Sequence, residues 1–232
     1  MKELNQKQVF EEIYTTGIET GDTVSNVRFL EKAVVLRPPV LEIGAGRGYV
    51  LNWLYQKGIE ATGLEISEEA IRCALQDFPG IRMMQYAGRV LPFPAGSVET
   101  VISFDVLEHF PDVNAHLADV RRVLRPNGFY AFQTPNILTN LPKEIICRGG
   151  FKKAREFHPS VQSYYGLKQK LKRNGFAFTF VKMPLISSEK YEVLKTWGWG
   201  WRLAVTCLAK FPEGLVPFAL RPNFWVVAQK MV

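Results

Sequence analysis

The sequence has few cysteines and no long apolar run. Its three cysteines, Cys73, Cys147 and Cys207, are widely spaced, which excludes a dense disulfide framework and the paired spacing of a zinc site and fits a reducing compartment. No segment reaches the roughly 20 uninterrupted apolar residues of a membrane span. The polar residues 1–14 lack the apolar core of a secretory signal peptide. We therefore expect a cytoplasmic protein.

Positive charge is in surplus, since 29 Lys and Arg against 22 Asp and Glu give a formal net charge of +7. Much of the surplus lies at residues 143–158 and 167–173. Such a surplus suits nucleic acid, anionic lipid or an acidic substrate, or only improves solubility. Solvated faces of helices and loops are the favoured interpretation, and charge alone does not predict a nucleic-acid partner.

Short apolar runs alternate with segments of helical spacing along most of the chain. The expected strands are residues 38–46, 60–67, 81–87, 98–106, 129–135, 176–184 and 223–230. The expected helices are residues 5–17, 25–36 with Ser25 as N-cap, 49–58 closed by Gly58, 67–78 capped by Ser67, 112–128 and 160–175. Strands that alternate with helices predict an α/β fold with a parallel sheet covered on both faces.

We expect a single domain, because the sequence contains no internal repeat and no low-complexity linker. Residues 1–36 form an N-terminal helical cap in this interpretation, and residues 37–183 form the core. Residues 184–222 form a late cap insertion, followed by the final strand at 223–232.

Three glycines follow the first expected strand at alternate positions: Gly44, Gly46 and Gly48. At the carboxyl end of a parallel strand, such a loop lets a ligand touch the backbone beside a helix N-terminus. A tight turn without a ligand is the alternative. Glu65 ends the second strand, where an acid accepts hydrogen bonds from ribose hydroxyls, or is only an exposed carboxylate. Together the two elements predict a site for a ribose-bearing nucleoside.

Four segments, "VLEIGAGRGYV", "GLEIS", "VLPFPAGSVETVISFDVLEHFPD" and "RVLRPNGFYAFQTPN", resemble the class I S-adenosylmethionine-dependent methyltransferases. The closest group is the broad one that includes the ubiquinone-biosynthesis enzymes. The resemblance covers residues 38–136 and extends to the segment before the sixth strand. It implies a Rossmann-like, seven-stranded, mostly parallel sheet with an antiparallel last strand, helices on both faces and small helical caps.

By this resemblance, the cofactor is S-adenosylmethionine, which leaves as S-adenosylhomocysteine. The implied cofactor-binding residues are Glu42, Gly44, Ala45, Gly46, Gly48, Glu65, Ile66, Ala87, Gly88 and Phe104. Glu42 and the glycine loop would hold the methionine part, and Ile66 would pack on adenine. The sequence departs from the family at Ala87, where the acid that accepts from the adenine amino group is usual. Tyr86 or nearby backbone would have to compensate.

An acceptor hydroxyl needs a base to remove its proton, and the candidate side chains lie at residues 105–109, which the resemblance places at the mouth of the active site. His109 is the candidate general base, because an unperturbed imidazole titrates near neutrality. A structural role at the turn before Pro111 is equally open. Asp105 and Glu108 would orient the substrate or cap the following helix. The remaining candidates have weaker support: His158 near the same cleft, His116 as an exposed helix residue, and Tyr14, Tyr164 and Tyr165 as cleft or packing residues.

The segment at 184–222 carries Trp197, Trp199 and Trp201 between glycines. Tryptophan beside basic residues suits a membrane interface. Three interpretations of this segment stay open. It forms a buried cap, a lid over the substrate pocket, or a surface for lipid or a partner chain. The 197–201 region is thus a candidate for peripheral membrane contact.

We expect methyl transfer to a small-molecule or lipid-linked acceptor. Nucleic acid is disfavoured as a substrate, since the Asn-Pro-Pro-aromatic tetrad of enzymes that methylate nucleic-acid amino groups is absent, and no metal site is expected. Two alternatives stay open. One is a non-catalytic methyltransferase-like binding module, which the change at Ala87 favours. The other is a nicotinamide-dependent oxidoreductase, which the early third glycine disfavours.

Overall fold

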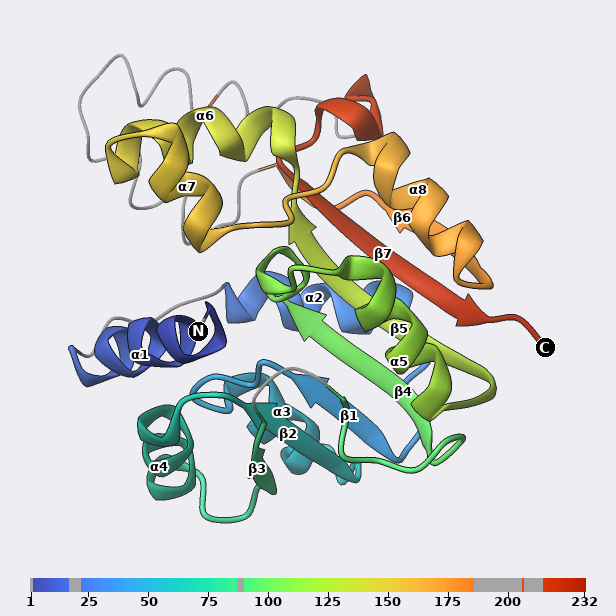
Figure 1. Cartoon of the computed structure of the whole chain (residues 1–232). Coiled ribbons are helices and arrows are strands. Elements are labelled where there is room, and N and C mark those ends of the chain that lie inside the picture. The colour runs from blue at the N-terminus through green and yellow to red at the C-terminus, as the bar shows by residue number, and fades with distance from the viewer. Residues whose placement is uncertain (1, 17–21, 87–89, 186–205, 207–214) are drawn as a thin grey trace.

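One mixed sheet forms the centre of the molecule (Figure 1). The computed structural model describes residues 2–16, 22–86, 90–185, 206 and 215–232. The strands are Val40–Ile43 (β1), Ala61–Glu65 (β2), Met83–Gln85 (β3), Val98–Phe104 (β4), Leu124–Pro135 (β5), Phe176–Val181 (β6) and Asn223–Lys230 (β7). Their order is β3-β2-β1-β4-β5-β7-β6, and β7 runs antiparallel to both β5 and β6. The predicted fold class, with its antiparallel last strand, is confirmed.

Alternating residues of the strands bury apolar side chains on both faces of this sheet. In β5, Tyr130 and Phe132 join the core cluster on one face, while Ala131 joins the cluster on the other. All four residues of β1 are buried. A strand with both faces covered needs apolar side chains on both, and Val40, Leu41 and Ile43 supply them, with the acid Glu42 as the exception.

The described residues form helices around the sheet, and some of these helices cover its two faces. The helices are Lys2–Thr15 (α1), Thr23–Ala33 (α2), Tyr49–Gln56 (α3), Glu68–Asp77 (α4), Val113–Val123 (α5), Ile137–Arg148 (α6), Phe151–Phe157 (α7) and Tyr164–Arg173 (α8). Short 3-10 helices lie at Leu107–His109 (η1) and Phe218–Leu220 (η3). Side chains of α2 and α3 belong to one core cluster, and those of α5 and α8 belong to the other. Among the described residues, no helix is both long and apolar enough to cross a bilayer.

Two of the expected helix caps can be compared with the structure. Ser67 caps α4, since its hydroxyl accepts from the Ala70 N–H at 3.1 Å. The prediction of Ser25 as an N-cap is wrong, because α2 begins two residues earlier and Asp22 caps it. The Ser25 N–H donates to the Asp22 carboxylate at 3.0 Å, and such an acceptor satisfies one of the open N–H groups of the first turn.

Helices α6 and α7 were not expected, because residues 143–158 were interpreted only as a basic surface. Figure 1 shows them beyond the tip of β5, while α1 lies beside α4 near the same edge of the sheet. Most of the expected late cap at 184–222, including Trp197, Trp199 and Trp201, lies outside the described residues. The carboxyl edge of the sheet is therefore where additional helices gather.

Candidate active site

A cavity of about 550 Å³ lies at the carboxyl ends of β1, β2 and β4. Its walls come from the loops after these strands, from α1, from α6 and from the end of α7. In open α/β sheets, ligands bind at this edge, where neighbouring connections leave in opposite directions. The position agrees with the site predicted from the glycine loop.

The glycine loop after β1 serves two purposes. Gly44 (φ +71°) and Gly46 (φ +52°) line the cavity. A Cβ on Gly44 would lie 2.3 Å from the Val106 side chain, and one on Gly46 would lie 2.8 Å from the Tyr14 hydroxyl oxygen. Gly48 (φ +74°) is not among the lining residues, and a Cβ there would lie 2.6 Å from the Ile81 side chain. Two glycines therefore open the cavity floor, and the third allows close packing.

Glu42 is an acid in the cavity wall whose side chain is hardly exposed to solvent. It is only 3% exposed, and among the described residues its Oε2 has no hydrogen-bond partner. Burial, together with the neighbouring Glu65, raises the pKa of this carboxyl to about 8. A buried acceptor without a partner is costly, so this oxygen is suited to a cationic or N–H-bearing ligand group.

Glu65 sits at the end of β2, where the sequence predicted it, but its carboxylate is turned toward the protein. Oε2 accepts from the Gly46 N–H at 2.8 Å, and Oε1 accepts from the N–H groups of Ile66 and Ser67 at 2.8 and 3.0 Å. A carboxylate has about four acceptor sites. Glu65 thus holds the glycine loop in place and keeps one site of Oε2 for a ligand.

The remaining predicted cofactor residues fall into two groups. Ala45, Ile66 and Phe104 all line the cavity. Ala87 and Gly88 lie outside the described residues. Tyr86, just before them, lines the cavity as well.

Three further ionisable side chains of the cavity wall lie close together. Glu108 and His109 belong to η1, and His158 follows α7. The rings of His109 and His158 have centroids 4.8 Å apart. Burial lowers the pKa of His109 to about 3, with a further contribution from His158. Burial, together with Asp105, raises the pKa of Glu108 well above its ordinary value.

Three of the other candidates are placed away from the cavity lining. The prediction that His116 is exposed is wrong: it is buried, stacks on Phe110 and lies 3.2 Å from the Tyr130 hydroxyl. Tyr164 packs against Phe180, with 4.8 Å between the ring centroids, and Tyr165 is 69% exposed. Tyr14, by contrast, lines the cavity.

Several lining residues were not singled out from the sequence. Phe10 of α1 contacts the His109 ring edge-on, with centroids 5.2 Å apart. Glu144 of α6 lies 3.6 Å from His158 Nδ1. Glu11 does not line the cavity, but its carboxylate holds α1 against the N-terminus of α4. None of these residues belongs to a strand-end motif, so no pattern in the sequence could have placed them at the cavity.

Comparison with known proteins identifies the class of domain that surrounds this cavity. Residues 41–132 match the family model described as a methyltransferase domain. The matched segment runs from β1 through β5 and includes the glycine loop, Glu65 and η1. Sequence match and sheet order together confirm the resemblance to class I S-adenosylmethionine-dependent methyltransferases.

Two curated relatives show how far the likeness extends. A probable S-adenosylmethionine-dependent methyltransferase of Mycolicibacterium smegmatis is 32% identical over 103 residues, which is 44% of this chain and 40% of the relative. A ubiquinone biosynthesis O-methyltransferase of Bordetella avium is 28% identical over 104 residues, 42% of each chain. The matches thus span about two fifths of the length of these relatives.

Solved structures share the fold over nearly the whole chain. One is the geranyl diphosphate C-methyltransferase of Streptomyces coelicolor, solved with Mg²⁺, geranyl diphosphate and S-adenosyl-L-homocysteine. It aligns with a TM-score of 0.62 and 15% identity, covering 90% of this chain and 79% of that one. At this identity the likeness concerns the fold alone.

Proposed function

We propose that this protein transfers a methyl group from S-adenosylmethionine to a small-molecule or lipid-linked acceptor. The observation that carries the proposal is Glu42. This buried acid in the cavity wall has an oxygen without a partner among the described residues, directly beside the bare backbone of Gly44 and Gly46. The methyltransferase family match over residues 41–132 supports the same cofactor.

The residues present fit this cofactor. Glu42 offers its open oxygen to the ammonium group of the methionine part, and a cation there would offset the burial of the carboxylate. Gly44 and Gly46 admit the ligand to the backbone. Glu65 keeps one acceptor site for a ribose hydroxyl, and Ile66 lies in the wall of the same cavity. When bound, the cofactor supplies an activated methyl group on sulfonium.

The acceptor would occupy the part of the cavity lined by α1, α6 and the end of α7, and would reach Glu108, His109 and His158. Alignment of the acceptor with the methyl group accounts for much of the rate of a displacement of this kind. A pKa of about 3 makes the His109 imidazole a weak base near neutrality. His109 therefore positions the acceptor in this proposal, and a strong side-chain base is not required of it.

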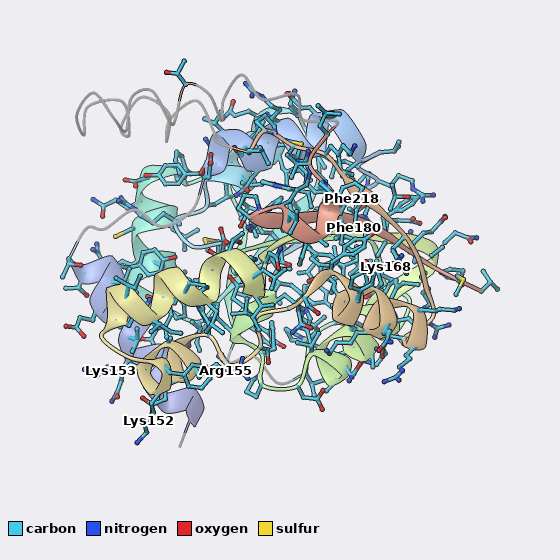
Figure 2. The ribbon with its side chains drawn as sticks, turned by 90° about the horizontal axis from the view of Figure 1, so that it is seen from above. Lys152, Lys153, Arg155, Lys168, Phe180 and Phe218 are labelled. Carbon is cyan, nitrogen blue, oxygen red and sulfur yellow. The ribbon has the colours of Figure 1, made fainter. Side chains whose placement is uncertain are left out.

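A lipid-linked acceptor is favoured by the outer face of α6 and α7. Ile146 is 80% exposed and Phe151 is 59% exposed. Figure 2 shows Lys152, Lys153 and Arg155 at the periphery of the molecule on α7. Apolar residues among basic ones suit an anionic membrane surface. The end of α7 also lines the cavity through Phe157, so one short helix joins this surface to the site.

Calorimetric titration with S-adenosylmethionine, S-adenosylhomocysteine and NADH tests the cofactor assignment. We expect the first two to bind with one site each and NADH not to bind. Glu65→Ala should weaken binding by roughly 1–3 kcal/mol, the scale for a lost hydrogen bond to a charged acceptor. Glu60→Ala is the matched control, since Glu60 is an exposed acid just before the same strand.

Two other outcomes would point elsewhere. Binding of NADH alone would favour the oxidoreductase alternative. Binding of S-adenosylmethionine without turnover of any acceptor would favour the non-catalytic module. If neither S-adenosylmethionine nor S-adenosylhomocysteine binds, the proposal is wrong.

A further inference from the structure

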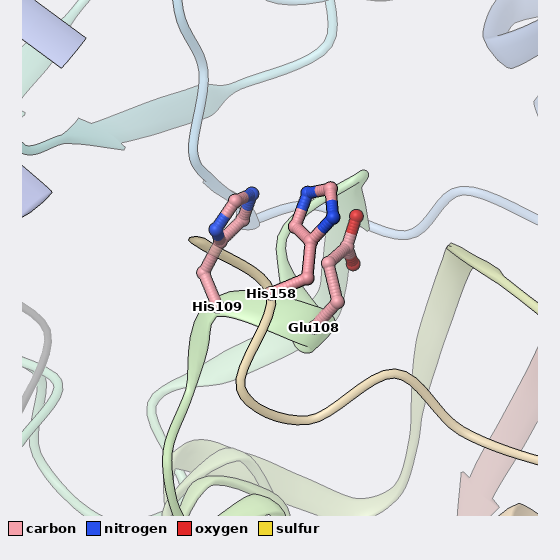
Figure 3. Close-up of side chains that lie close together, drawn as sticks. All are labelled: Glu108, His109 and His158. Carbon is pink, nitrogen blue, oxygen red and sulfur yellow. The ribbon is translucent and has the colours of Figure 1, made fainter. Parts of the chain in front are cut away.

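Glu108, His109 and His158 bring three potential metal ligands together within the cavity wall. One ligand atom from each side chain lies within 4.8 Å of those from the other two. Figure 3 shows the three side chains side by side, with the His158 ring between His109 and the Glu108 carboxylate. They come from two segments about fifty residues apart, η1 and the end of α7. The sequence placed His109 and His158 near one cleft, but no motif predicted a group of metal ligands.

The His109 ring is held in the tautomer that a metal needs. Its Nδ1 lies 3.2 Å from the carbonyl oxygen of Phe157. A carbonyl only accepts, so Nδ1 carries the proton and Nε2 presents its lone pair. Histidines that bind metals typically donate their other ring N–H to a carbonyl or carboxylate in this way.

The other two side chains also have polar neighbours. His158 Nδ1 faces the Glu144 carboxylate at 3.6 Å. Glu108 Oε2 accepts from the Thr134 hydroxyl at 3.1 Å, in a fully buried position. His109 and Glu108 thus each have a hydrogen-bonded neighbour that fixes their orientation, and His158 faces an acid slightly beyond hydrogen-bond distance. This is the arrangement that outer partners of a metal site provide.

The charges around the cluster favour a cation. Asp105, Glu108 and Glu144 all line this cavity, and the Glu144 carboxylate lies 3.6 Å from His158 Nδ1. Against these three acids, Arg148 contributes one positive charge and pairs with Glu144 at 2.5 Å. A bound divalent ion would offset the repulsion among the acids and the burial of Glu108.

We propose that Glu108, His109 and His158 bind a divalent transition-metal ion of the zinc type at the acceptor end of the cavity. Two imidazoles and one carboxylate suit such ions better than Mg²⁺ or Ca²⁺, which prefer oxygen ligands alone. Three protein ligands leave a position open, as in catalytic zinc sites. That position would bind an acceptor with a hydroxyl or carboxylate oxygen. Only this assignment of an acceptor rests on the proposed function; metal binding does not.

Cobalt titration of the metal-free full-length protein tests the site, because Co²⁺ replaces zinc and absorbs visible light. We expect one equivalent to bind, with d–d absorption bands. His109→Ala and His158→Ala should each weaken binding at least about tenfold, and Glu108→Gln should shift the bands. His116→Gln is the matched control, because His116 is the remaining histidine of the chain and lies outside the cluster.

Circular dichroism of each variant separates loss of a ligand from loss of the fold. If His109→Ala does not fold, His158→Ala decides the question, since His158 follows the end of a short helix. Unchanged Co²⁺ affinity in folded His158→Ala, or no Co²⁺ binding by the wild-type protein, overturns the proposal. Titration of the metal-free protein with S-adenosylhomocysteine is scored separately. Cobalt binding without cofactor binding overturns only the proposed function, and the reverse result overturns only the metal site.

Discussion

At the scale of single residues, Glu42 shows a conflict between stability and binding. Its carboxyl is buried, and its pKa is raised to about 8. The folded protein therefore holds a proton that the unfolded chain releases above about pH 4.5. The stability contributed by the protonated side chain is fully present below that pH and is lost as the pH rises through about 8. Because the buried carboxyl does not stabilise the folded chain near neutral pH, its presence is best explained by binding to a ligand.

Glu42→Gln should therefore stabilise the ligand-free protein, and increasingly so at higher pH. Glutamine keeps the size of the side chain without a group that ionises. Between pH 6 and pH 8, the difference in free energy of unfolding between variant and wild type should grow by roughly 2–3 kcal/mol, at about 1.4 kcal/mol per pH unit. Urea denaturation at the two pH values measures it.

The exposed acid Glu60 provides the control for this experiment, since Glu60→Gln should show no such pH dependence. Titration with S-adenosylmethionine should meanwhile show weaker binding to Glu42→Gln. If the stability curves of Glu42→Gln and the wild type run parallel between pH 6 and pH 8, Glu42 does not carry the buried proton.

Residues tied to strand ends could be predicted from the sequence, and residues brought in by packing could not. Glu42, Gly44, Gly46 and Glu65 lie in the cavity wall because a parallel sheet brings its carboxyl ends to one edge. His116 was misplaced because polar neighbours in a helix do not show which face is buried. Its ring reaches Tyr130 of β5, a contact that only the fold creates.

At the scale of elements, the Glu11 side chain makes several of the hydrogen bonds that join α1 to α4, beside an ion pair between Lys7 and Glu68. The Glu11 carboxylate accepts from the Ser67 hydroxyl at 2.7 Å and from the N–H groups of Glu68 and Glu69 at 2.8 and 3.0 Å. It therefore occupies the N-terminus of α4, where open N–H groups and the helix dipole favour an anion. Since Phe10 and Tyr14 of α1 line the cavity, this contact positions one wall of the site.

Glu11→Gln should loosen α1 without unfolding the sheet. The amide loses the charge and one acceptor oxygen, and loss of a helix-capping interaction amounts to about 1 kcal/mol. Amide hydrogen exchange in α1 should accelerate roughly fivefold for that energy, while the core strands keep their protection. Glu12→Gln, at the neighbouring exposed acid, is the control. Equal exchange rates in the two variants would show that Glu11 does not hold the helix.

The sequence predicted most elements of the sheet region but missed α6 and α7. Strands and helices that alternate have clear boundaries, and each strand carries a buried apolar run. In contrast, α6 contains Pro142 in its interior and α7 spans only Phe151–Phe157. A proline and a short basic segment both argue against a helix by local rules. Both helices follow β5 and line the site. Their formation therefore depends on tertiary packing and not on local sequence preference.

At the scale of the whole molecule, the cavity wall is built both from the segment that matches the family model and from segments outside it. The matched methyltransferase domain at 41–132 supplies β1 to β5 and the cofactor side of the cavity. The wall proposed for the acceptor combines η1, which lies inside the match, with α1, α6 and α7, which lie outside it. Acceptor specificity in this protein would therefore depend partly on segments that the family resemblance does not cover. This division explains why the sequence indicated a cofactor and named no acceptor.

The outer face of α6 and α7 predicts how the molecule meets its acceptor. If the acceptor is lipid-linked, the protein should co-sediment with vesicles that contain anionic phospholipid, and added salt should release it. Each Lys or Arg near such a surface contributes about 1 kcal/mol. Combining Lys152→Glu with Lys153→Glu should therefore abolish most of the binding. The double change Lys172→Glu with Arg173→Glu on α8 alters the net charge equally and is the matched control. Equal loss of binding in both double variants would indicate a general effect of net charge, and no co-sedimentation of the wild-type protein at low salt would favour an acceptor that diffuses freely.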